Sequence, residues 1–108
     1  MIRALAAVAL LSLSACGGIN VGMPCAKADE CEPGLQCATD NAPGGFCSRG
    51  CVEIGSAYEC PASTRCTWMG GTTQICSPLC NSNGDCRVNY ECKELAGSGG
   101  KKTCVTAR

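Results

Sequence analysis

The chain has 108 residues, of which thirteen are cysteine and fourteen are glycine, and histidine is absent. Such a cysteine content in a short chain is typical of a disulfide scaffold rather than of a domain with a large apolar core. Nine basic and nine acidic residues balance, so no charge excess points to nucleic acid as a partner. The lack of histidine excludes histidine-based catalysis and histidine metal ligands.

The first segment, residues 1–15 (MIRALAAVALLSLSA), predicts a signal peptide. Arg3 supplies the positive start, and the apolar run from Ala4 to Leu13 has the length of a signal-peptide core, about 7–15 residues. The run is shorter than the roughly 18 apolar residues that a membrane span needs. We therefore expect an exported chain.

The end of this segment, Leu13-Ser14-Ala15-Cys16, resembles the lipobox of bacterial lipoproteins. In that family the cysteine sulfur receives a diacylglycerol, the chain is cut before the cysteine, and the new amino terminus is acylated. The resemblance implies lipidation at Cys16, with no cofactor beyond these lipids, and a place in the bacterial cell envelope. The residue after Cys16 is not Asp, which favours the outer membrane. The alternative is an ordinary secreted protein, cut after Gly17, that discards Cys16 with its leader.

Residues 16–24 (CGGINVGMP) predict a short flexible tether between the lipid and the domain. One acyl chain holds a protein only marginally on a bilayer, whereas two or more hold it stably. A triacylated Cys16 would therefore make the lipid bilayer a lasting partner of the chain. Residues 25–108 are then the cysteine-rich domain.

The other twelve cysteines divide into three groups of four, which span residues 25–47, 51–76 and 80–104. An acidic residue (Glu30, Glu59 or Asp85) precedes the second cysteine of each group, where it is expected to cap loop amides rather than to bind calcium. A glycine-bearing turn separates the third cysteine from the fourth. We predict a small disulfide-rich fold of three tandem repeats, each an irregular loop plus a short β-hairpin, with little or no helix outside the signal peptide.

An even number of cysteines in an exported chain predicts full pairing. Pairing within each group of four leaves about 27 connectivities, because each group allows three. We favour first with third and second with fourth, since this crossed pattern ties the loop to the hairpin. The hypothesis gives Cys25–Cys37, Cys31–Cys47, Cys51–Cys66, Cys60–Cys76, Cys80–Cys92 and Cys86–Cys104.

The run from Pro24 to Cys37, PCAKADECEPGLQC, resembles the start of the Dickkopf amino-terminal cysteine-rich domain. It is equally similar to cysteine-rich repeats in lipoproteins of myxobacteria and their relatives. The four-disulfide-core inhibitors share the Cys-x5-Cys-x5-Cys spacing but continue with adjacent cysteines, which this chain lacks. The resemblance covers residues 24–104 and rests on spacing, so it implies a fold, and Wnt-pathway binding is not carried over.

The sequence contains no recognisable metal-binding or catalytic motif. Zinc and redox sites favour Cys-x2-Cys pairs, but the closest cysteines here are separated by three residues, so we predict no metal site. The segment from Asn81 to Asp85 alternates oxygen ligands but lacks the later glutamate of a calcium loop, and we interpret it as a turn. Without histidine or a carboxylate dyad, the chain is predicted not to be an enzyme.

Trp68 and Met69, near the tip of the second hairpin, are the binding candidates, because exposed tryptophan is frequent at binding hot spots. The competing interpretation is that Trp68 covers a disulfide. Lys101 and Lys102 are interpreted as a solvated tip. The leading hypothesis is a membrane-anchored bacterial envelope lipoprotein that displays a non-catalytic module for binding, adhesion or a structural role, with an unidentified protein or surface ligand. The alternative is a freely secreted cysteine-rich effector or protease inhibitor.

Overall fold

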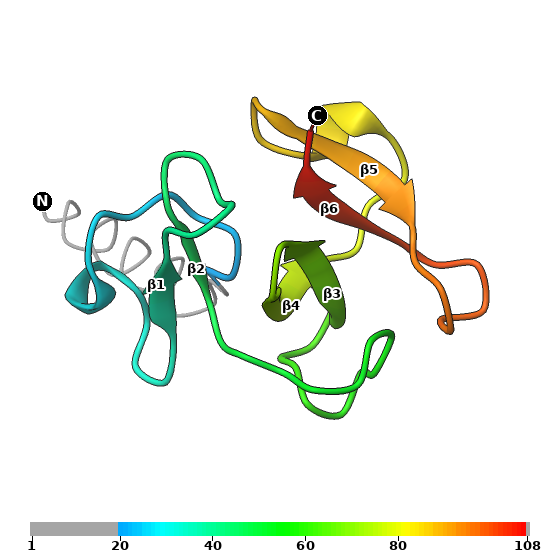
Figure 1. Cartoon of the computed structure of the whole chain (residues 1–108), viewed down its shortest axis with the longest axis horizontal. Coiled ribbons are helices and arrows are strands. Elements are labelled where there is room, and N and C mark those ends of the chain that lie inside the picture. The colour runs from blue at the N-terminus through cyan, green and yellow to red at the C-terminus, as the bar shows by residue number, and fades with distance from the viewer. Residues whose placement is uncertain (1–19, 108) are drawn as a thin grey trace, which may run out of the picture.

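The computed structural model describes residues 20–107, so the predicted signal peptide and the predicted lipidation site Cys16 lie outside the described residues. Within this range the chain forms three two-stranded antiparallel hairpins, one in each four-cysteine group (Figure 1). The strands are β1 (Gln36–Ala38) with β2 (Phe46–Ser48), β3 (Thr64–Gly70) with β4 (Thr73–Pro78), and β5 (Tyr90–Glu94) with β6 (Lys102–Thr106). We call the groups unit 1 (25–47), unit 2 (51–76) and unit 3 (80–104). The predicted small disulfide-rich fold of loops and short hairpins is confirmed.

Helical structure in the described residues is limited to two 3-10 turns, η1 (Ala28–Glu30) and η2 (Asn83–Asp85). Each turn lies in the loop that precedes a hairpin. No helix in residues 20–107 is long and apolar enough to cross a membrane. Strands β3 and β4 form the longest hairpin, because their pairing runs from Thr64 with Pro78 to Gly70 with Thr73.

The disulfides attach each loop to its own hairpin. The third and fourth cysteines of every unit face each other across the two strands, as in the pair Cys66 and Cys76. Each of them binds one cysteine of the preceding loop, first with third and second with fourth. The bonds are Cys25–Cys37, Cys31–Cys47, Cys51–Cys66, Cys60–Cys76, Cys80–Cys92 and Cys86–Cys104. They are the six pairs predicted from the sequence.

The turns between paired strands depend on glycine at positions where the backbone has positive φ. Gly45, in the turn of unit 1, has φ 79°, and a Cβ atom there would lie 1.8 Å from the carbonyl oxygen of Cys25. The loop and the turn therefore touch at a point where only a hydrogen fits. This approach lets the amide of Cys25 donate to the carbonyl oxygen of Gly44 at 3.2 Å.

The small apolar core is shared by all three units rather than divided among them. Its members are Val21, Ala42, Phe46, Met69, Ile75 and Tyr90. The rings of Phe46 and Tyr90 lie 5.3 Å apart and join unit 1 to unit 3. Because each unit contributes one or two side chains, none of them buries a core alone, and the three units pack as one body.

The connections between units pair with the hairpin that follows them. Ser48 Oγ donates to the carbonyl oxygen of Cys76 at 2.5 Å, and Ser77 Oγ donates to that of Cys104 at 2.6 Å. In the segment before unit 1, the backbone amide of Gly22 donates in the same way to the carbonyl oxygen of Cys47 at 2.7 Å. The residue three positions before the first cysteine of each unit therefore binds the fourth cysteine of that unit.

The described part of the predicted tether (16–24), residues 20–24, is bound to the domain. Val21 is only 6% exposed and packs in the core, and Gly22 binds Cys47 as just described. The side-chain oxygen of Asn20 accepts a bond from the Glu32 amide at 3.2 Å. The composition of the segment suggested flexibility, but Val21 fills a core that is otherwise short of apolar side chains.

Candidate binding groove

A groove of about 490 Å³ lies between the second and third hairpins. We call its buried and half-buried lining residues the floor, which includes Thr67, Met69, Thr103 and Val105, and its exposed lining residues the rim. Ile54 and Leu95 also line the groove. The hydroxyls of Thr67 and Thr103 form a bond 2.9 Å long where β3 and β6 meet. Both threonines are fully buried, so the two hairpins touch beside the hollow.

Trp68 stands at the rim of this groove and is 54% exposed. Its indole nitrogen donates to the carbonyl oxygen of Gly71 at 2.8 Å, so the ring is held in one orientation beside the turn. The competing interpretation, that part of the ring covers a disulfide, stays a prediction. A fixed, half-exposed indole is a contact surface that loses little conformational entropy on binding.

Met69, the next residue of β3, is not a surface residue. Its side chain is 3% exposed and belongs to the core, although it also forms part of the groove floor. The register of β3 with β4 is irregular between Trp68 and Gly70, so Met69 is an extra residue of β3 without a partner in β4. Met69 supports the floor, and only Trp68 can reach out to a partner.

The rim of the groove carries charges from β5. Lys93 and Glu94 lie along it beside half-buried Glu91, and Lys93 Nζ is 3.5 Å from Glu91 Oε2. The Lys93 side chain is 61% exposed and that of Glu91 27%, and an ion pair so open to solvent contributes little to stability. The groove thus combines an apolar floor, one aromatic side chain at the rim and a mixed-charge border, an arrangement that suits recognition of an amphipathic surface.

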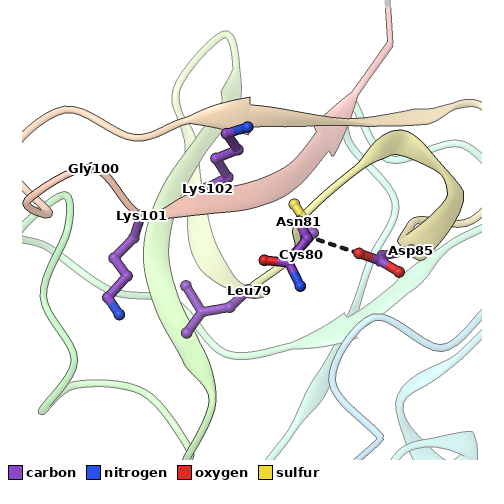
Figure 2. A pocket seen from close by; sticks show the side chains of 7 residues that line it. All are labelled: Leu79, Cys80, Asn81, Asp85, Gly100, Lys101 and Lys102. Carbon is purple, nitrogen blue, oxygen red and sulfur yellow. Dashed lines mark hydrogen bonds between the residues drawn. The ribbon is translucent and has the colours of Figure 1, made fainter.

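A second hollow, of about 460 Å³, lies beside the loop of unit 3 (Figure 2). Its polar groups do not converge on one point. Lys101 and Lys102 project in opposite directions from the chain, and the Asp85 carboxylate already accepts the Asn81 amide at 2.8 Å (Figure 2). The two lysines are exposed, as expected for a solvated tip. We find no arrangement here that would hold an anion or a metal ion.

The three loop acids cap backbone amides, as predicted. Glu30 accepts from Ala26, Glu59 accepts from Val52 and Glu53, and Asp85 accepts from Asn81 and Ser82. At Asp85, the amides of Asn81 and Ser82 favour the ionised carboxylate and hold its pKa below the ordinary value. The Asn81–Asp85 segment is the predicted turn, in which Asn83 also accepts the Cys92 amide at 2.8 Å.

Close sets of cysteines recur in each unit, for example Cys25, Cys31 and Cys47. Every cysteine in these sets is engaged in a disulfide, so its sulfur has no thiolate to offer a metal. The sets are the ends of the paired disulfides that cross each hairpin. They add no chemistry beyond crosslinking while the bonds are intact.

Sequence reasoning missed the residue that joins units 1 and 3. Arg87 donates to the carbonyl oxygens of Gly22, Gly45 and Pro43 at 2.8–3.1 Å. Its guanidinium also lies 4.9 Å from the centre of the Tyr90 ring. Burial raises the pKa of Tyr90, and its hydroxyl donates to Pro43 as well, at 3.0 Å. Only the position of Arg87 in the loop of unit 3 was visible in the sequence, and that position does not indicate its distant partners.

Comparisons of this chain with protein-family models, with curated proteins and with solved structures found no match. The groove and the fold are therefore interpreted from their own geometry.

Proposed function

We propose that the chain is a bacterial envelope lipoprotein, anchored by lipidated Cys16, that displays a non-catalytic binding module. The lipobox-like Leu13-Ser14-Ala15-Cys16 supports the anchor, and the disulfide-bonded fold suits an oxidising compartment outside the cytoplasm. The groove beside Trp68 would be the site at which the module binds a protein or surface ligand.

The observation that carries the binding role is the position of Trp68 at the rim of the groove. Four disulfides and a shared core hold the two hairpins that form it, so the groove exists before a partner arrives. Preorganised sites avoid part of the entropy cost of association. In a module with a purely structural role, a half-exposed indole held in one orientation would have no evident purpose.

Replacing the lipidated cysteine tests the anchor. We expect Cys16→Ala to move the protein from the membrane fraction of the producing cell to the soluble fraction, because the substitution removes the atom that carries the lipid. A mass shift of the mature native protein that matches a diacylglycerol and an acyl chain would agree with this result. An unchanged distribution, with release into the medium in both cases, would instead favour the secreted alternative.

A photo-crosslinking residue at Glu94, on the rim of the groove, tests the binding role. We expect crosslinked products in intact cells, and we expect Trp68→Ala to abolish them because the main contact surface is lost. Val88→Ala is the matched control, since Val88 is 83% exposed and lies outside the groove lining. Equal products from both variants would contradict a role for Trp68.

A further inference from the structure

The segment that leads to the lipid leaves the folded domain at a defined point. Asn20 is tied to the Glu32 amide, Val21 is buried, and the carbonyl oxygen of Gly22 accepts from Arg87 at 2.8 Å. A Cβ atom at Gly22 would lie 3.1 Å from Pro78 Cγ, so the backbone here is tightly enclosed. Four consecutive residues are therefore fastened to the domain, including Met23, whose carbonyl oxygen accepts from the Cys47 amide at 2.9 Å and whose amide donates to Asn20 at 3.2 Å.

This attachment limits how far the domain can stand from its lipid. Only residues 17–19 lie between Cys16 and Asn20, and four residue steps span at most about 14 Å in any conformation. The acyl chains place Cys16 at the level of the headgroups, a layer about 5–8 Å thick on each side of the bilayer. Much of the available length is therefore used in leaving the headgroup layer.

The exit point also presents an apolar side chain to the surroundings. Met23 is 52% exposed and lies next to Asn20 through the bond between their backbones. Loss of the signal peptide would remove Arg3 and leave nine acidic residues with eight basic ones, so anionic lipid would not attract the domain. Contact between the domain and the membrane would then depend on the short covalent connection to the lipid and on the apolar side chain of Met23.

We propose, on the basis of the lipid anchor proposed above, that the domain lies directly against a zwitterionic phospholipid surface. The side that faces the headgroups, which we call the exit face, is the one where the chain leaves the domain at Asn20 and where Met23 is exposed. The module would then act on partners in or next to the same membrane. It could not reach a target far from the bilayer, as a domain on a long linker could.

The chain contains its own probes for a test of this proposal. Cleavage before Cys16 removes one of three methionines and leaves two, exposed Met23 at the exit face and buried Met69 in the core. We would label both methyl groups with ¹³C in the native lipidated protein and place it in phosphatidylcholine nanodiscs with a gadolinium-chelating headgroup. The expected result is a several-fold stronger paramagnetic relaxation of the Met23 methyl than of the Met69 methyl. Equal relaxation of the two methyls would overturn the proposal.

A spacer provides the matched control. Inserting twenty Gly/Ser residues between Gly18 and Ile19 adds a root-mean-square length of about 25 Å without changing residues 20–107. We expect the spacer variant to remain in the membrane fraction while the excess relaxation of Met23 falls several-fold. Unchanged relaxation in the spacer variant would contradict the role of the short connection. A native protein that never associates with membranes would refute the lipid anchor itself, an outcome distinct from these two.

Discussion

Unit 3 meets the other two units in different ways. Against unit 1 it uses Arg87, which binds three carbonyl oxygens, and the Tyr90 ring, which packs on Phe46. Against unit 2 it uses two hydroxyl bonds, Thr67 to Thr103 and Ser77 to the carbonyl of Cys104. The first junction is filled, whereas the second leaves the groove of about 490 Å³ beside it.

The difference indicates that the two junctions have different roles in the same domain. The filled junction satisfies carbonyl groups and stacks aromatic rings, so it stabilises the arrangement of the three units. The open junction contributes fewer bonds but holds Trp68 at its rim. Substitutions at the first should therefore reduce stability most, whereas substitutions at the rim of the second should affect binding.

Reduction of all disulfides should remove both junctions together and has the largest expected effect. Each crosslink closes a loop of 12 to 18 residues, and a loop near 15 residues contributes about 3 kcal/mol in the chain-entropy model. The small core shared by three units cannot replace this contribution. We expect amide hydrogen exchange to lose its protection throughout residues 20–107. Near-native protection after complete reduction would contradict the prediction.

Replacement of Arg87 by Met should open the filled junction while the disulfides remain intact. The substitution removes three charge-assisted hydrogen bonds, two of them part-buried, so we expect the free energy of unfolding to fall by about 2–3 kcal/mol. Guanidinium denaturation without reductant measures the change. Arg65→Met is the matched control, because Arg65 makes a single carbonyl contact, with Gly55 at 3.3 Å. Similar losses in both variants would show that the contacts of Arg87 contribute no more to stability than the single contact of Arg65.

The contrast between predicted and unpredicted features follows the same division. Cysteine spacing and glycine turns were sufficient to predict the hairpins, the crossed disulfides and the capping roles of Glu30, Glu59 and Asp85, because all of these are local to one unit. Contacts between units are not local. Arg87 binds Gly22 across 65 positions of sequence, and no pattern in a single sequence indicates such a pair.

The candidate site was predicted only in part for a related reason. Trp68 stood out as the one tryptophan, but the groove beside it depends on Leu95 and Thr103 of another hairpin. Met69 was paired with Trp68 by adjacency in sequence, whereas the strand places it in the core. Val21 was assigned to a tether because its neighbours are glycine and polar residues. That composition does not show that the core needs another apolar side chain.

At the open junction, Thr67→Val should have a moderate effect. It removes the bond to Thr103 and leaves a buried hydroxyl without its partner, so we expect a loss of about 1–2 kcal/mol. Adding Thr103→Val should recover part of that loss, because both polar groups are then gone and the shape is preserved. A double-mutant cycle in guanidinium measures the coupling. Additive losses would mean that the bond does not hold the floor of the groove.

The smallest expected effect lies outside both junctions, in the loop that carries Arg87. The amides of Asn81 and Ser82 hold the pKa of Asp85 below its ordinary value of 3.8, and the carboxylate is exposed. A lowered pKa in the folded state means that the cap stabilises the loop above pH 3.8 and loses this effect as the pH falls through the lowered pKa. Acid should therefore shift the amide signals of Asn81 and Ser82 in NMR spectra, and Asp85→Asn should abolish that titration. Because the contacts of Arg87 with Gly22 and Gly45 do not involve the Asp85 carboxylate, they should persist, and their loss in the same pH range would mean that the filled junction depends on the loop cap.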